Sequence, residues 1–137
     1  MKVKLSNMIS NDQLEISYLG DIPDLRSVLS TTDIFIFPTR SVSEGFPLSI
    51  CEAGFEKNLV ITSNFFGLNS IFIEDEDGIV FQLGDAKNLA DKIIYSVSNF
   101  ENLRQMINNF HNKCQKEFNL ELMIDKTLKL YNEVLIN

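Results

Sequence analysis

The sequence contains no long apolar run. No segment approaches the roughly 20 consecutive apolar residues that a helix needs to cross a bilayer. The opening residues, Met1-Lys2-Val3-Lys4-Leu5, lack the apolar core and the cleavage site of a secretory signal. These absences predict a cytoplasmic protein without a transmembrane segment, with at most a peripheral place at the inner face of the membrane.

Cysteine and histidine are scarce as well. Cys51 and Cys114 belong to no CxxC motif and no Cys/His cluster, which argues against a zinc site or a redox pair. We expect both to be reduced thiols in the core. The single histidine, His111, falls on a predicted helix remote from the candidate site described below, so we expect no catalytic role for it.

Basic residues are outnumbered by acidic ones, and the net charge is −7. Broad attraction to nucleic acid or anionic lipid needs a basic surface, so nucleic acid is not an expected partner and any phosphate must be held by a local site. Hydrophobic residues make up 45% of the 137 residues. That composition suffices for one domain over residues 1–137 that buries roughly two thirds of its unfolded surface.

Apolar strand patterns alternate with helical patterns along the chain. Strands are predicted at residues 14–19, 33–37, 59–62 and 79–81, helices at 3–11, 24–29 and 47–57, and a helical turn within 68–74. Three amphipathic helices follow, with apolar faces that contain Leu89, Ile93, Ile94 and Val97; Leu103, Met106, Ile107 and Phe110; and Leu122, Ile124, Leu128, Leu130, Tyr131 and Val134. This order predicts an α/β, Rossmann-like parallel sheet with helices on both faces and a helical C-terminus.

The segment from Glu44 to Glu52 carries the strongest functional signal. Glu44 and Gly45 are expected on a tight loop after the strand Ile34-Phe35-Ile36-Phe37, with Pro47 as the first helical residue and Glu52 inside the helix. A helix N-terminus at the carboxyl end of a parallel strand attracts phosphate through free N–H groups and the helix dipole. Carboxylates beside it can accept hydrogen bonds from vicinal hydroxyls. Phosphate and polyol together indicate a nucleotide sugar.

Several nearby residues have two interpretations. Arg40 contacts phosphate or is a surface charge, and Lys57 complements the dipole at the end of the helix. Phe65 and Phe66 could stack on a base or sugar, although core closure is the more frequent role of such a pair. The acidic run Glu74-Asp75-Glu76-Asp77 resembles a calcium or magnesium ligand set, but such runs are usually solvated loops.

Short words of sequence occur along the chain in a specific order. They are Tyr18-Leu19-Gly20, Asp33-Ile34-Phe35-Ile36-Phe37-Pro38-Thr39, Glu44-Gly45-Phe46-Pro47-Leu48, Glu52-Ala53, Val60-Ile61-Thr62, Asp77-Gly78-Ile79-Val80-Phe81, Gly84-Asp85, Asn88-Leu89-Ala90, Phe118-Asn119 and Tyr131. One word alone is weak, whereas this many in order are a strong signal. From about residue 14 to its end, the chain resembles the nucleotide-sugar-binding C-terminal half of GT-B glycosyltransferases of the group 1, family 4-like kind.

The resemblance implies a division of labour within the segment. Glu44 would meet hydroxyls of the transferred sugar as the catalytic residue, and Glu52 would bind the ribose hydroxyls. Backbone N–H groups near Gly45, Phe46 and Leu48 would meet the diphosphate, and Pro47, which has no N–H group, belongs to the same donor-binding stretch. The resemblance also implies transfer with retention to a glycan or lipid-linked acceptor in polysaccharide biosynthesis. It implies no essential metal and no cofactor besides the nucleoside-diphosphate sugar itself.

The chain departs from the family pattern in places. The stretch Arg40-Ser41-Val42-Ser43 is longer than the usual loop, and its Arg40 would supply positive charge for a diphosphate. Phe66-Gly67 and Ser70 stand where the family commonly has a double glycine and a glutamate. The N-terminal acceptor domain and an early basic Arg/Lys pair have no counterpart. The resemblance therefore implies an incomplete C-terminal domain of a GT-B fold.

These observations leave three hypotheses. The first is the donor-binding part of a glycosyltransferase. The second is a non-catalytic, truncated binding module that pairs with a separately encoded acceptor-domain protein. The third is another doubly wound protein, such as a flavodoxin-like or receiver domain. An uncovered sheet edge is also expected, which favours self-association.

Overall fold

The computed structural model describes residues 16–41 and 44–135. The helix predicted over residues 3–11 and the start of the strand predicted over 14–19 lie outside these ranges. Residues 16–19 form no strand, and Ile16, Tyr18 and Leu19 are exposed. The strand prediction is therefore wrong for these residues. An alternating pattern forms a strand only beside a neighbour, and the strands of the described sheet pair only with one another.

A parallel sheet forms the centre of the molecule. Its strands are β1 (Ile34–Phe37), β2 (Leu59–Ser63) and β3 (Ile79–Phe81), in the order β1-β2-β3. Ile34 pairs with Leu59 and Ile61 with Ile79, so the strands start nearly level. Every residue of β2 is buried, as expected for a strand between two others with helices on both faces. The predicted α/β parallel sheet is confirmed.

Within the described residues, seven helical segments surround or follow the sheet, and aspartates cap two of them, α2 (Leu25–Leu29) and α4 (Ala86–Ser98). The others are α3 (Leu48–Phe55), the 3₁₀ turn η1 (Leu68–Ser70), the 3₁₀ turn η2 (Phe100–Leu103), α5 (Arg104–Glu117) and α6 (Leu120–Leu135). The Asp24 carboxylate accepts a hydrogen bond from the Arg26 N–H at 3.1 Å, and the Asp85 carboxylate accepts one from the Asn88 N–H at 2.9 Å. Each satisfies an otherwise free N–H group at a helix start.

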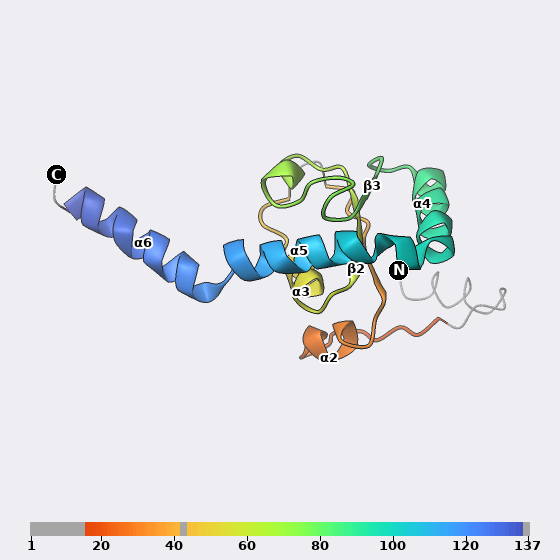
Figure 1. The fold of residues 1–137 in the computed structure, drawn as a ribbon, viewed down its shortest axis with the longest axis horizontal. Coiled ribbons are helices and arrows are strands. Elements are labelled where there is room, and N and C mark those ends of the chain that lie inside the picture. The colour runs from red at the N-terminus through yellow and green to blue at the C-terminus, as the bar shows by residue number, and fades with distance from the viewer. Residues whose placement is uncertain (1–15, 42–43, 136–137) are drawn as a thin grey trace.

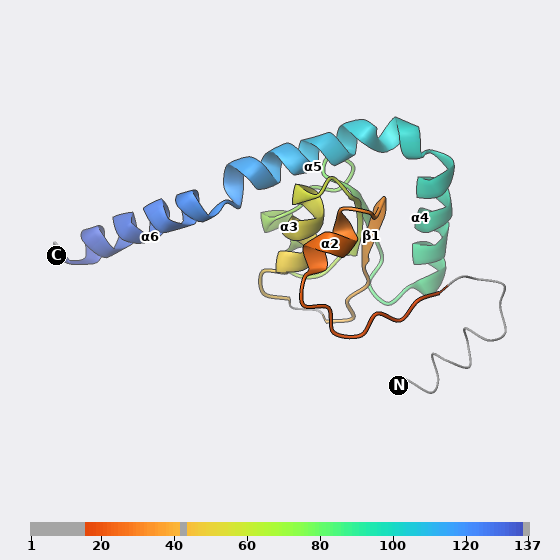
Figure 2. The same cartoon turned by 90° about the horizontal axis from the view of Figure 1, so that it is seen from below.

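The two faces of the sheet bury different side chains. On one face, Val60 and Val80 pack with α2, α3, η1 and the second half of α5; on the other, Leu59 and Ile61 pack with α4, η2 and the first half of α5. Figure 2 shows α2 and α3 together on one side of β1 and α4 on the other. The helices therefore cover both faces, as the alternating pattern predicts.

The apolar face predicted for α4 is only partly correct. Leu89 and Ile93 pack against the sheet, whereas Ile94 and Val97 are each 65% exposed. The packed part of α4 is narrower than its apolar arc, because α4 contacts the sheet mainly along β3. Periodicity predicts a helical face but not how much of it a neighbour covers.

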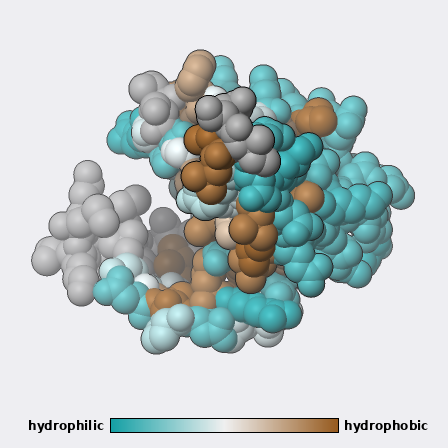
Figure 3. All heavy atoms as spheres, turned by 90° about the vertical axis from the view of Figure 1, so that its left-hand side faces the viewer, coloured by the Kyte–Doolittle hydropathy of each residue, from teal (hydrophilic) through white to brown (hydrophobic). Residues whose placement is uncertain are grey.

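The last helix, α6, projects away from the sheet (Figures 1 and 2). The predicted helix is confirmed, but none of its residues is buried. Its exposed apolar residues are Leu120, Met123, Ile124, Leu128, Leu130, Tyr131, Val134 and Leu135. Viewed from the end of the molecule to which α6 points, hydrophobic side chains form distinct bands among hydrophilic ones (Figure 3). None of the described helices has the length and hydropathy of a membrane span.

Candidate functional site

Glu44 is held at the carboxyl edge of the sheet by Thr39. The Thr39 hydroxyl donates a hydrogen bond to the Glu44 carboxylate and accepts one from the Ser41 N–H at 3.1 Å. The Thr39 carbonyl accepts a hydrogen bond from the hydroxyl of Ser63, the last residue of β2, at 3.1 Å. Thr39 therefore joins the ends of β1 and β2 to the loop, and Glu44 sits half-buried beside both strand ends.

The helix α3 starts at Leu48, directly after this loop. Pro47 has extended backbone angles (φ −75°, ψ 92°) and occupies the N-cap position. The prediction that Pro47 is the first helical residue is wrong by one position, because its backbone angles are not helical. Its carbonyl nevertheless accepts a hydrogen bond from the Ile50 N–H at 3.0 Å, as an N-cap residue does. A proline side chain cannot cap a helix, so no N-cap side chain occupies the first N–H groups of α3. The start of α3 follows directly on the loop that leaves the carboxyl end of β1.

The same helix ends earlier than predicted. Its last residue is Phe55, and Lys57 adopts φ 60° in the left-handed region. The N–H of Lys57 donates to the Gly54 carbonyl at 3.2 Å. This is the usual way in which a tight turn closes a helix end.

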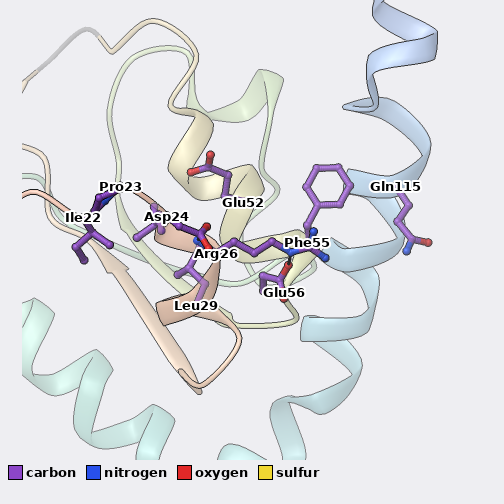
Figure 4. A pocket seen from close by; sticks show the side chains of 10 residues that line it. Ile22, Pro23, Asp24, Arg26, Leu29, Glu52, Phe55, Glu56 and Gln115 are labelled. Atoms are coloured by element: carbon purple, nitrogen blue, oxygen red, sulfur yellow. Dashed lines mark hydrogen bonds and ion pairs between the residues drawn. The ribbon is translucent and has the colours of Figure 1, made fainter.

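Glu52 lies one turn into α3 and lines a pocket of about 560 Å³. The other lining residues are Ile22, Pro23, Asp24, Leu25, Arg26, Leu29, Phe55, Glu56 and Gln115. Figure 4 shows the Glu52 side chain projecting from α3 above the side chains that come from α2. The pocket therefore lies between α2 and α3, with an exposed carboxylate on its wall.

An ion pair forms part of this pocket. The Arg26 Nε donates to the Glu56 carboxylate at 2.6 Å, with the Arg26 side chain 81% exposed and that of Glu56 17% exposed. The sequence analysis singled out Glu52 as a site residue but not the other residues that line this pocket. One signal in the sequence could have located them. The stretch from Gly20 to Asp24 joins the family word Tyr18-Leu19-Gly20 to the cap of α2, so it must lie beside the start of that helix.

Arg40 lies in a different hollow. It is exposed and lines a pocket of about 290 Å³ with Pro38, Thr39, Phe81, Gly84, Asp85, Ala86 and Leu89, at the start of α4. Thr39 therefore bonds Glu44 and also lines this second pocket with Arg40. Neither of them lines the pocket that contains Glu52.

The remaining residues of the predicted segment form an open surface. Phe46 is 50% exposed and Leu48 66% exposed. No atom lies within 4 Å of the position that a Cβ would take at Gly45, so a ligand can approach the backbone there. The ring of Phe46 packs edge-on against Phe118, with centroids 5.3 Å apart.

Other residues singled out in the sequence lie away from this loop. The His111 ring nitrogen Nδ1 is 3.1 Å from the Gly54 carbonyl, at the far end of α3. Phe65 is buried in the core, as core closure predicts, whereas Phe66 is 84% exposed. Asp77 of the acidic run is buried, and its carboxylate binds Lys113 at 2.7 Å.

The two cysteines are free and buried, which confirms the prediction of core thiols. They belong to the same hydrophobic cluster, Cys51 on α3 and Cys114 on α5. The hydrogen bond with the Cys51 sulfur, and then burial, raise the pKa of the Cys114 thiol far above its usual range.

Comparison with known proteins decides whether the chain is a glycosyltransferase-like protein or another doubly wound protein. Residues 1–113 match the model of the group 1 glycosyl transferases. The chain belongs to this family. The predicted resemblance is confirmed, and the flavodoxin-like or receiver alternative is excluded.

Two curated relatives of the chain are named for sugars linked to diphosphoundecaprenol. One is the Escherichia coli UDP-Gal:alpha-D-GlcNAc-diphosphoundecaprenol alpha-1,3-galactosyltransferase, which is 31% identical over 119 residues, 87% of this chain and 30% of the relative. Another is the Campylobacter jejuni N,N'-diacetylbacillosaminyl-diphospho-undecaprenol alpha-1,3-N-acetylgalactosaminyltransferase, which is 31% identical over 124 residues, 89% of this chain and 32% of the relative. The chain thus spans about a third of the length of these relatives.

Solved structures share the fold. A glycosyltransferase from Rickettsia africae superposes with a TM-score of 0.89 at 26% identity, covering 99% of this chain and 37% of that protein. Anabaena HepE, crystallised with UDP and glucose, superposes with a TM-score of 0.87 at 16% identity over 96% of this chain and 36% of its own. The described arrangement is therefore that of one part of a GT-B glycosyltransferase.

Proposed function

We propose that this chain is the donor-binding part of a glycosyltransferase and that it binds a nucleoside-diphosphate sugar at the carboxyl edge of its sheet. The observation that carries the proposal is the Glu52 carboxylate on the wall of a 560 Å³ pocket, one turn from a helix start with no capping side chain. The pocket provides room for a nucleoside, and the helix start provides N–H groups for phosphate.

Each residue of the segment takes a role that fits its placement. Glu52 accepts hydrogen bonds from the ribose hydroxyls inside the pocket, because a carboxylate can accept from both hydroxyls of a diol. The diphosphate lies at the open backbone from Gly45 to Leu48, and Glu44 contacts hydroxyls of the transferred sugar. Arg40, which follows Thr39 in the chain and is exposed, adds positive charge near the diphosphate.

The chemical step follows from these roles. Breaking the bond between the sugar and the diphosphate places negative charge on the departing nucleoside diphosphate. N–H groups at the start of α3, together with Arg40, stabilise that charge. We propose UDP-sugars as the donors, since the galactosyltransferase relative is named for UDP-Gal and HepE was crystallised with UDP. The alpha linkages and diphosphoundecaprenol acceptors in both relatives' names support transfer with retention to a lipid-linked acceptor.

Isothermal titration calorimetry of the purified chain with UDP-, GDP- and ADP-sugars tests the proposal. Losing a hydrogen bond to a charged group costs about 1.5–3 kcal/mol, so Glu52→Gln should weaken binding about 10- to 100-fold. Glu44→Gln should weaken binding of the sugar nucleotide but leave binding of free UDP unchanged. Glu117→Gln, an exposed change on α5, serves as the matched control. No heat of binding at millimolar ligand from a folded sample would refute the proposal.

A non-catalytic binding module that pairs with a separately encoded acceptor domain is the second candidate. Release of nucleoside diphosphate from a UDP-sugar, abolished by Glu44→Gln, would rule out this candidate. Donor binding without release, even after addition of an acceptor-domain protein and a lipid-linked acceptor, would favour it.

A further inference from the structure

The joint between α5 and α6 is held by a single side chain. The Asn119 side-chain amide donates to the Gln115 carbonyl at 2.9 Å, and its oxygen accepts from the Leu122 N–H at 2.8 Å. Asn119 thus closes the last turn of α5 and caps the first turn of α6. Phe118, the residue before it, donates its N–H to the Cys114 carbonyl at 3.0 Å. These hydrogen bonds fix the backbone conformation at the joint.

The Phe118 ring lies between the core and the candidate donor loop, defined as residues Glu44 to Pro47. It is partly buried and packs against the cluster that contains the core residues of α3 and α5. It also meets the ring of Phe46, with centroids 5.3 Å apart and planes at 70°. This edge-to-face arrangement is the favoured geometry of aromatic pairs.

The donor loop has side-chain anchors at two points. Thr39 holds Glu44 at the start of the loop, and Phe118 holds Phe46 just before α3. Gly45, between these anchors, has open space around it. The position of the backbone where the diphosphate is proposed to bind therefore depends on where the Phe46 ring packs against Phe118.

We propose that Phe118 is a positioning residue for the donor loop, so that the α5–α6 joint sets where the loop backbone meets a bound diphosphate. Phe118 acts through Phe46 and does not itself contact the ligand. The helix α6 begins two residues after Phe118, and none of its residues is buried against the rest of the described chain. The joint therefore determines both the direction of α6 and the position of the Phe46 ring. The inference rests on the proposed function for its effect on ligand binding, but not for the contact itself.

Tryptophan fluorescence tests the positioning directly, because the chain contains no tryptophan. In Phe46→Trp, the introduced indole reports the surroundings of the loop. Adding Phe118→Leu, which keeps an apolar contact with the core but removes the ring, should shift the emission to longer wavelength and increase quenching by acrylamide. Phe118→Tyr should keep the emission of Phe46→Trp. Phe100→Ala, in the other hydrophobic cluster, is the matched control and should change neither quantity.

Calorimetry of the variants without tryptophan tests the consequence for binding. An aromatic pair contributes enough for Phe118→Leu to weaken UDP-sugar binding about 2- to 10-fold, while Phe118→Tyr restores it. Phe100→Ala should lower the melting temperature without changing the affinity. The double variant with Phe46→Leu should lose no more affinity than Phe46→Leu alone.

The outcomes separate the two proposals. If Phe118→Leu changes emission no more than Phe100→Ala does, the positioning role is overturned. If emission changes but the affinity stays the same, the loop does not transmit the contact to the ligand, and the inference is also overturned. If even the unmodified chain binds no donor while the emission change persists, the proposed function fails and Phe118 only shapes the loop.

Discussion

The ion pair between Lys113 and Asp77 yields the most quantitative prediction. Lys113 Nζ lies 2.7 Å from the Asp77 carboxylate, and the two side chains are 16% and 6% exposed. The same carboxylate oxygen accepts the Ile73 N–H at 2.8 Å. The pair joins α5 to the turn before β3. Replacing Lys113 by Met keeps most of the side-chain volume but leaves the Asp77 charge buried without its cation.

The expected cost of Lys113→Met follows from the burial of the pair. Removing one partner of a buried ion pair destabilises by about 3–5 kcal/mol, because the remaining charge stays desolvated. For a chain of this size each kcal/mol lowers the melting temperature by about 3–5 °C, which predicts a decrease of about 9–25 °C. Asp77→Asn removes the charge but keeps an acceptor for the Ile73 N–H. The double variant should therefore be more stable than Lys113→Met alone.

Thermal melting followed by circular dichroism, with chemical denaturation as a second measurement, tests this reasoning. Lys87→Met, which breaks the exposed pair with Asp91, is the control and should leave the melting temperature unchanged within error. A cost below about 1 kcal/mol for Lys113→Met would refute the claim that the Asp77 charge is effectively buried. A double variant less stable than Lys113→Met would refute the claim that the cost comes from an unpaired charge.

Three further predictions concern packing and association. A Cβ at Gly54 would lie 2.5 Å from the Cys114 Sγ and 2.7 Å from the ring of buried Phe110, so Gly54→Ala should destabilise by about 1–3 kcal/mol in thermal melts; an unchanged melting temperature would contradict the close packing of α3 on α5. Cys114 is fully buried, and its hydrogen bond with Cys51, followed by burial, raises the pKa of its thiol, so iodoacetamide should label Cys114 at pH 8 only after unfolding. Labelling of Cys114 itself in the native chain, located by peptide mapping, at the rate of a free thiol would contradict this. The outer edge of β1 is unpaired among the described strands, so sedimentation should show association that increases with concentration. This association should persist in Leu128→Glu on α6. Loss of association in that variant would show that the contact is made by α6 and not by the edge of β1.

Much of the fold was predictable because local patterns and global packing agree. The apolar runs Ile34-Phe35-Ile36-Phe37 and Leu59-Val60-Ile61 lack the alternation of a sheet with a solvated face, and both lie in the parallel sheet. Asp85 marks the start of α4 because its side chain accepts the Asn88 N–H. The turn at Gly67 has φ 94°, a conformation that favours glycine. In these places a few neighbouring residues determine the structure.

The predictions that failed depend on contacts between distant residues. Ile94 and Val97 fit the helical period of α4 as well as Ile93 does, and only the position of the sheet leaves them exposed. The exposed apolar face of α6 belongs to the same class, since periodicity describes the helix and not its neighbour. The strand pattern at residues 16–19 likewise forms nothing without a partner strand.

The candidate site was predictable in its location but not in its internal geometry. The order strand, loop, helix places Glu44 at the carboxyl edge of the sheet, and the helical period places Glu52 one turn into α3. The contacts around them join distant residues: Thr39, which holds Glu44, bonds Ser63, and Arg26 pairs with Glu56, 30 residues away, in the pocket that Glu52 lines. No local pattern in the sequence encodes such pairs.

The two acids are held by different parts of the molecule, and this limits how a ligand can contact both. Thr39 ties Glu44 to the ends of β1 and β2, while Glu52 is carried by α3, which packs closely on α5 through Gly54. Strand ends and a packed helix cannot shift independently without disturbing the core. The loop between the acids is therefore the only part of the segment that can adapt to a bound diphosphate. Because Gly45 lies in open space, that adaptation is limited chiefly at Phe46, where the loop meets Phe118.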